Sequence, residues 1–171
     1  MLPVLVLAGC GGTGTTKPAV PAAGQYPVAT APPQVLAIPV VSDGHYQLVA
    51  AGQPVVVRRA GAVALVEAAG PELNPVAVAA GQAPVQHAPG TLTVTVRPRS
   101  GRLDVQAAGF LALDGAKNRI ALRADRPAVS ADPQHPATMH LRAVFPAGHT
   151  ILTWQPAGKP LVTWDFVVEL D

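Results

Sequence analysis

The sequence predicts an all-β fold, an antiparallel sandwich or barrel, over residues 36–171. Apolar and polar residues alternate in about ten short runs, as they do in half-buried strands. Turn signals such as Asp43-Gly44, Asp114-Gly115 and Pro146-Ala147-Gly148 separate these runs. No stretch longer than about ten residues keeps a helical period of 3.6 without a breaker. We therefore expect little or no helix.

The strongest strand signals lie in the second half of the chain. Residues 91–96, 139–145 and 161–170 each place their large apolar side chains on one face. We expect this face to be buried, with Met139 in the core. Trp154 and Trp164, on consecutive strands, are expected to form a paired core or edge cluster; an exposed aromatic platform for sugar is the alternative. Residues 62–69 fit a short helix and a strand equally well. Weaker strand candidates are residues 35–41, 45–50, 54–59, 103–107, 110–113, 119–124 and 150–154.

The N-terminal part has a different composition. Residues 1–9 are an apolar run that ends directly before Cys10, the only cysteine of the chain. Residues 11–35 are rich in Pro, Gly and Thr and poor in large apolar side chains, so we expect a disordered tether there. The apolar run is too short to cross a bilayer as a helix, which takes about 20 residues. It therefore indicates a processing signal.

The motif Leu7-Ala8-Gly9-Cys10 resembles the lipobox of bacterial lipoproteins. The resemblance implies acylation of Cys10 and a lipid anchor on the extracytoplasmic face of the cell membrane. Residues 1–9 lack the basic residues of a signal peptide. We expect them to be a signal-peptide remnant, because translation begins upstream of Met1 or because the N-terminus is clipped. The alternative is an accidental apolar N-terminus with a free thiol. The expected order is the remnant (1–9), the lipidated tether (10–35) and the sandwich domain (36–171).

Composition narrows the possible functions. The chain has 171 residues, which suits one domain and a tail, and its formal net charge is +2. This charge is too small to indicate a nucleic-acid partner. Nine arginines against three lysines, with abundant Ala, Val, Pro and Gly, indicate GC-rich coding and an actinobacterial source. With Cys10 acylated, no cysteine remains for a disulfide, so burial alone must hold the domain together.

Residues 91–171 carry a recurring set of short motifs. The alternating strand at 91–96 is followed by Leu103-Asp104-Val105, by Phe110-Leu111-Ala112-Leu113-Asp114-Gly115 and by Ile151-Leu152-Thr153-Trp154. This set resembles the immunoglobulin-like β-sandwich domain of unknown function found in Gram-positive and actinobacterial lipoproteins. Secreted sandwich proteins of mycobacteria are of the same general type. The resemblance implies an extracellular sandwich with no known catalytic residues. Arg97-Pro98-Arg99 replaces the family's usual Asn, and the disulfide of true immunoglobulin domains is absent.

Histidines are the candidate metal ligands. His135 and His140 lie on either side of Met139 in the sequence, and His149 follows nine residues later. Imidazole and thioether ligands together suit copper. The alternative function is therefore an extracytoplasmic carrier of copper or a small ligand that uses His135, His140 and His149. However, neighbouring residues of a strand point to opposite faces, which separates Met139 from His140. Solvated surface histidines without a cofactor are the simpler interpretation.

Arg97, Arg99 and Arg102 are expected in one loop, where they could contact an anionic envelope polymer or a lipid headgroup. The alternative is that these charges only keep the domain soluble.

Asp165 and Glu169 would lie about 13 Å apart along a strand, too far for a glycosidase acid/base pair. No Gly-x-Ser-x-Gly motif is present. We therefore expect a non-enzymatic, lipid-anchored envelope protein whose sandwich binds an exported protein or a wall component, and no nucleic acid.

Overall fold

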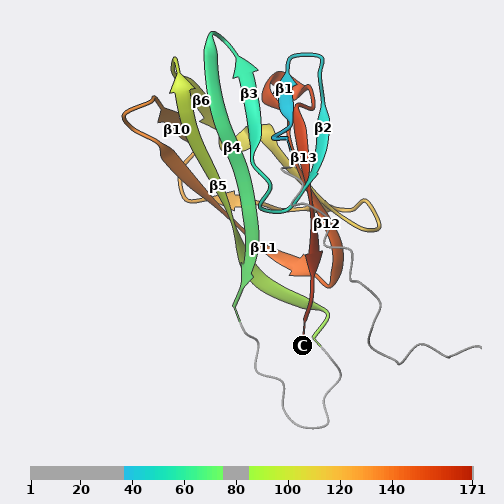
Figure 1. The fold of residues 1–171 in the computed structure, drawn as a ribbon. Helices are drawn as coiled ribbons and strands as arrows, with labels where there is room; N and C mark the ends of the chain where they lie inside the picture. Colours follow the sequence, from blue (N-terminus) through green and yellow to red (C-terminus); the bar gives the residue numbers. More distant parts are fainter. Residues whose placement is uncertain (1–36, 75–84, 171) are drawn as a thin grey trace, which may run out of the picture. The chain divides into compact units, whose positions relative to one another are not determined.

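Two β-sheets pack against each other in the computed structural model, which describes residues 37–74 and 85–170 (Figure 1). One sheet has six strands in the order β1-β3-β4-β5-β11-β9, and the other has five in the order β2-β13-β12-β7-β8. The predicted β-sandwich is therefore confirmed. Cys10, the lipobox-like motif and the tether lie outside the described residues.

The six-stranded sheet contains the longest strands. β4 and β5 pair antiparallel, and so do β5 and β11, while β1 pairs parallel with β3. The bounds are β1 (Val40–Ser42), β3 (Val55–Arg59), β4 (Ala62–Leu73), β5 (His87–Ser100), β9 (Arg123–Ala124) and β11 (Ala137–Pro146).

The five-stranded sheet is built around β12. This strand pairs antiparallel with β13 and β7, and β2 pairs parallel with β13. The bounds are β2 (Gln47–Ala50), β7 (Phe110–Asp114), β8 (Arg119–Ile120), β12 (Gly148–Trp154) and β13 (Val162–Val168). A separate ladder joins β6 (Leu103–Gln106) to β10 (Ala128–Ala131), and two single 3-10 turns are η1 (Ala107–Gly109) and η2 (Pro156–Gly158).

The inward faces of both sheets form one apolar core. Met139, Trp154 and Trp164 are fully buried in it, as their alternation predicts. The Trp154 ring stacks on Phe110, with ring centroids 6.1 Å apart. The Trp164 indole Nε1 donates a hydrogen bond of 3.0 Å to the carbonyl oxygen of Gln53. The polar atom of Trp164 is thus satisfied although its ring is buried.

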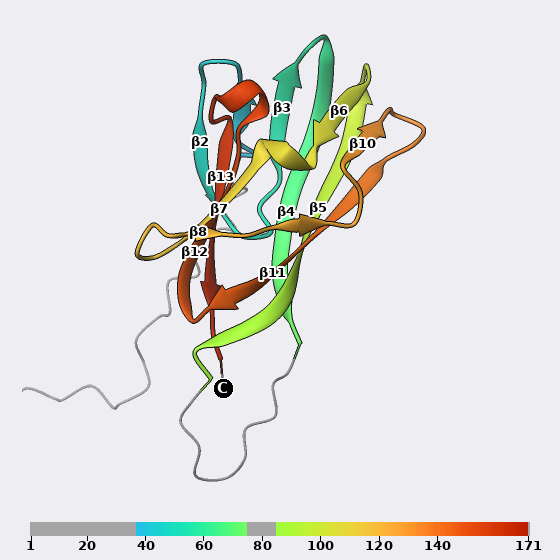
Figure 2. The ribbon, with the colours of Figure 1, turned by 180° about the vertical axis from the view of Figure 1, so that it is seen from behind.

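Several elements differ from the sequence-based expectation. Residues 62–69, which also fit a helix, belong to the strand β4, and β10 was not anticipated. Residues 119–124 do not form one strand, because β8 belongs to the five-stranded sheet and β9 to the six-stranded sheet. Figure 2 shows this crossing from behind. Residues 40–50 cross between the sheets in the same way, and both parallel pairings involve the strands of that crossing.

Within the described ranges, no helix is long and apolar enough to cross a bilayer.

Candidate binding site

Two turns touch at one end of the six-stranded sheet, where β3 leads into β4 and β5 leads toward β6 (Figure 1). Gly101 has a φ of +70°, and a Cβ at this position would lie 2.8 Å from the carbonyl oxygen of Gly61. Only glycine allows this backbone conformation and this close approach without strain. The contact brings Arg58 and Arg59 of β3 to the same end of the molecule as Arg102.

Arg97 and Arg99 do not lie in a loop, so that prediction was wrong. β5 continues to Ser100, and both arginines are exposed on its outer face. Pro98 does not end the strand, because it is buried on the inner face opposite Ala64, beside a register shift in the β4–β5 ladder. Proline is tolerated at such irregularities of a sheet. Of the three predicted arginines, only Arg102 lies in the turn.

Three of the arginines at this end form ion pairs. Arg59 lies 3.4 Å from Asp43, Arg97 lies 3.8 Å from Glu67, and Arg102 lies 3.4 Å from Asp104. Within residues 37–74 and 85–170, Arg58 and Arg99 form no ion pair. Five arginines therefore face three carboxylates, and this end carries an excess of positive charge.

Asp104 connects the arginines to the β6–β10 ladder. Its carboxylate accepts a hydrogen bond from the Ser130 hydroxyl of β10 and pairs with Arg102. The Ser130 hydrogen bond is the main cause that lowers the pKa of Asp104, and Arg102 adds to it. Asp104 is therefore ionised at neutral pH, and its carboxylate lies 3.4 Å from the Arg102 guanidinium in an exposed ion pair.

A cavity of about 460 Å³ lies between this end of the sheet and the two 3-10 turns. Trp154 and residues of η1 and η2 line it. The backbone N–H of Gln155 donates a hydrogen bond of 2.7 Å to the Gly109 carbonyl, which joins these two turns. The size of the cavity suits a small ligand. The lining combines apolar residues with four polar side chains of both charge signs, and it contains no serine, cysteine or histidine. The polar lining side chains are Arg59, Asp104, Gln106 and Gln155.

The three candidate metal ligands are separated by the fold. His140 lies on β11 in the six-stranded sheet, with its ring Nδ1 3.3 Å from the Thr93 hydroxyl. His149 lies on β12 in the other sheet, with Nδ1 3.4 Å from Asp165. His135 lies in the turn between β10 and β11. In the described part of the chain, no group of three His, Cys, Asp or Glu side chains could hold a metal ion.

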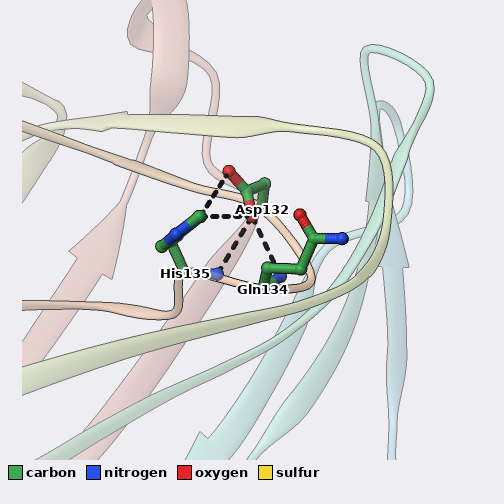
Figure 3. Close-up of polar contacts among 3 residues, drawn as sticks. All are labelled: Asp132, Gln134 and His135. Atoms are coloured by element: carbon green, nitrogen blue, oxygen red, sulfur yellow. Dashed lines mark hydrogen bonds and ion pairs between the residues drawn. The ribbon is translucent and has the colours of Figure 1, made fainter.

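Asp132 organises the turn that carries His135 (Figure 3). Its carboxylate accepts hydrogen bonds of 2.9 Å from the backbone N–H groups of Gln134 and His135, and the His135 ring lies 3.1 Å away. The N–H of Gln134 is the main cause that lowers the pKa of Asp132. This is an Asx-type turn, in which the side chain replaces a backbone acceptor. Asp132 therefore stabilises the turn around His135. The two residues do not belong to a group of three possible metal ligands in the described residues.

The sequence alone did not identify several residues that the fold brings to the arginine-bearing end of the six-stranded sheet. Arg58 and Arg59 directly precede the turn Ala60-Gly61, and Arg99 and Arg102 flank Gly101. This repeated combination of arginines and a glycine turn was a usable signal, because β3 and β5 run in the same direction and the turns that follow them lie at the same end of the sheet. No sequence signal pointed to Gln106 or Gln155, since their proximity depends on how η1 packs against η2.

The comparisons with known proteins show remote similarity in fold. No family model and no curated protein matches the chain. A secreted Mycobacterium tuberculosis protein, MPT63, is 12% identical with a TM-score of 0.48, over 70% of this chain and 97% of its own. A candidate lipoprotein from Bacillus subtilis (ycdA) is 15% identical with a TM-score of 0.42, over 61% and 36%. An uncharacterized β-sandwich protein from Clostridium difficile 630 is 8% identical with a TM-score of 0.41, over 70% and 93%.

Proposed function

We propose that the chain is a lipid-anchored protein of the cell envelope, and that its sandwich is a non-catalytic module that binds an anionic envelope polymer. The observation that carries this proposal is the gathering of five arginines at one end of the six-stranded sheet. Two of them, Arg58 and Arg99, have no carboxylate partner in the described part of the chain. Guanidinium groups bind phosphate and carboxylate oxygens through paired hydrogen bonds.

The spread of the arginines favours a polymer over a single small anion. Arg58 pairs with Val63, and Val63 pairs with Ser100, so Arg58 and the end of β5 lie two strands apart. At about 4.8 Å per strand, this is about 10 Å across the sheet. Arg97 lies further back along β5. A chain with repeated negative charges can contact all of these positions, and a single anion cannot.

The lipid anchor at the cell envelope is part of the same proposal. It is supported by the lipobox-like motif Leu7-Ala8-Gly9-Cys10 and by the Pro/Gly/Thr-rich residues that follow it. Cells that express the wild-type chain should incorporate an alkyne fatty acid into the protein, and Cys10→Ser should abolish this labelling. Equal labelling of both chains would refute the anchor.

Polymer binding is tested by calorimetry on the full chain carrying Cys10→Ser, so that no acyl group contributes. The probes are poly(glycerol phosphate) and polygalacturonate, with dextran as the neutral control. We expect binding to the anionic probes, weakening at high salt because exposed charges are screened over about 10 Å at 0.1 M. Dextran should not bind.

Charge reversal locates the binding surface. The double variant Arg99→Glu, Arg102→Glu should weaken binding by about tenfold or more, or about 1.4 kcal/mol. The double variant Arg123→Glu, Arg142→Glu is the matched control, because it reverses the same number of charges. Both arginines are exposed on the same sheet, and Arg142 pairs with Thr91, about 26 Å along β5 from Arg99. An equal loss in both variants would show general charge attraction and overturn the assignment of this end.

A further inference from the structure

The outer face of the five-stranded sheet carries a group of aliphatic side chains among polar ones, and it is uncovered in the described structure. Leu48 of β2 and Val167 of β13 are 61% and 60% exposed. Leu111 and Leu113 of β7 and Ile151 of β12 lie between these strands and the β8 edge, each partly exposed. Thr153, Thr163, His149 and Asp165 share this face with the aliphatic side chains. Exposed aliphatic side chains grouped on one sheet face are typical of an interaction surface.

Two opposite charges lie in one cross-strand row of this face, on either side of Leu113 and Ile151. The register places Arg119 opposite Leu113, Leu113 opposite Ile151, and Ile151 opposite Asp165. Arg119 and Asp165 are therefore three strands apart, about 14 Å, and do not pair within one chain. In the described residues Arg119 forms no ion pair, and the Asp165 carboxylate pairs only with the His149 ring, at 3.4 Å.

A second copy of the chain fits this pattern in one orientation. A two-fold axis that runs along β12, in the plane of the interface, places Ile151 against the same residue of the second copy. It also places the β7–β8 side of one copy over the β13–β2 side of the other. Arg119 then lies beside the carboxylate of Asp165 in the second copy, within reach of its long side chain. An axis across the strands would instead bring like charges together.

We propose that this face is a homodimer interface, with its two-fold axis along β12 and two reciprocal ion pairs between Arg119 and Asp165. The face is about 20 Å wide across its strands, which places it at the small end of specific interfaces. The dimer should therefore dissociate on dilution. This interface lies on a different sheet from the arginine-bearing end, so its existence does not depend on polymer binding.

The first test is the solution mass of the full chain carrying Cys10→Ser, measured by sedimentation over a range of concentrations. We expect a concentration-dependent shift from monomer to dimer. Ile151→Lys should abolish the dimer, because it places two like charges together at the axis. Val144→Lys is the control, since Val144 is 58% exposed on the other sheet and its replacement should leave the dimer intact.

The second test exchanges the charges. Arg119→Asp and Asp165→Arg should each weaken the dimer, because each creates a like-charged pair across the interface. The double variant should restore association, because the pair is opposite in charge again. Circular dichroism shows whether each variant is folded. A wild-type chain that stays monomeric at every concentration, or a dimer that Ile151→Lys leaves unchanged, would overturn the proposal. A double variant no tighter than either single variant would also overturn it.

Discussion

Thr150 places a hydroxyl in the apolar core. The residue is fully buried on the inner face of β12, and its Oγ1 has no hydrogen-bond partner in the described residues. A buried hydroxyl without a partner costs about 1–3 kcal/mol. Thr150→Val removes this cost with little change of shape, so the variant should be about 1 kcal/mol more stable. The midpoint of urea unfolding, at an unchanged slope, measures the effect.

Thr163 provides the matched control for that prediction. It is 2% exposed, but its hydroxyl bonds the Thr153 hydroxyl at 2.7 Å. Thr163→Val should therefore destabilise the protein by about 1 kcal/mol, because Thr153 loses its partner. The same substitution thus has opposite signs at two buried positions of adjacent strands. If both variants lose stability, the Thr150 hydroxyl is satisfied in solution and the prediction is wrong.

The turn between β10 and β11 should respond to acid through Asp132. The folded-state pKa of this carboxyl is lower than its ordinary value of 3.8, mainly because of the Gln134 N–H. A group with a lowered folded-state pKa stabilises the fold above its unfolded pKa and loses this effect as pH falls through the folded pKa. Asp132→Asn should therefore melt at a lower temperature than the wild type at neutral pH. The difference should close below pH 3.8. Melting curves across this range test it, and a difference that widens in acid would contradict it.

At the scale of whole elements, the strands that could be predicted are those with large alternating side chains. The run at 91–96 belongs to β5, the run at 139–145 to β11 and the run at 161–170 to β13. The pattern is readable because one face of each is buried and the other is solvated. β4 begins with Ala-Val-Ala-Leu-Val, where small residues make the helical and extended patterns equivalent. β10 is Ala-Val-Ser-Ala, too short and too weakly apolar to stand out.

Strand pairing and the binding end were less predictable for a related reason. Alternation shows which face of a strand is buried, but not which strand lies beside it, so the two parallel pairings had no signal. The same limitation affected the arginines. The predicted strand at 91–96 ends before Arg97, but β5 continues to Ser100 with Pro98 facing inward. Arg97 and Arg99 were therefore expected in a loop and lie on a strand instead.

At the scale of the molecule, the chain crosses between the sheets where the sheets end. β1 and β9 are the outer strands of the six-stranded sheet, and the adjoining segments β2 and β8 are the outer strands of the other. Each crossing thus supplies one short edge strand to each sheet. In the six-stranded sheet, β1 lies beside β3 and β9 beside β11, so these longer strands do not present a full row of unpaired backbone groups. Short edge strands limit unwanted pairing with other chains. An association through the outer face of a sheet is compatible with this protection, whereas edge-to-edge association is not.

The continuous core predicts that the two sheets unfold together. Leu92 of β5 is fully buried in the six-stranded sheet, while Trp154 and Trp164 belong to the five-stranded sheet and share one core with it. Leu92→Ala should cost about 2–5 kcal/mol, because it removes buried methyl groups and leaves a cavity. If the core is one cooperative unit, tryptophan fluorescence and far-ultraviolet circular dichroism should give the same lowered denaturation midpoint. If the fluorescence midpoint stays at its wild-type value while the dichroism midpoint falls, the sheets unfold separately and one cooperative core is excluded.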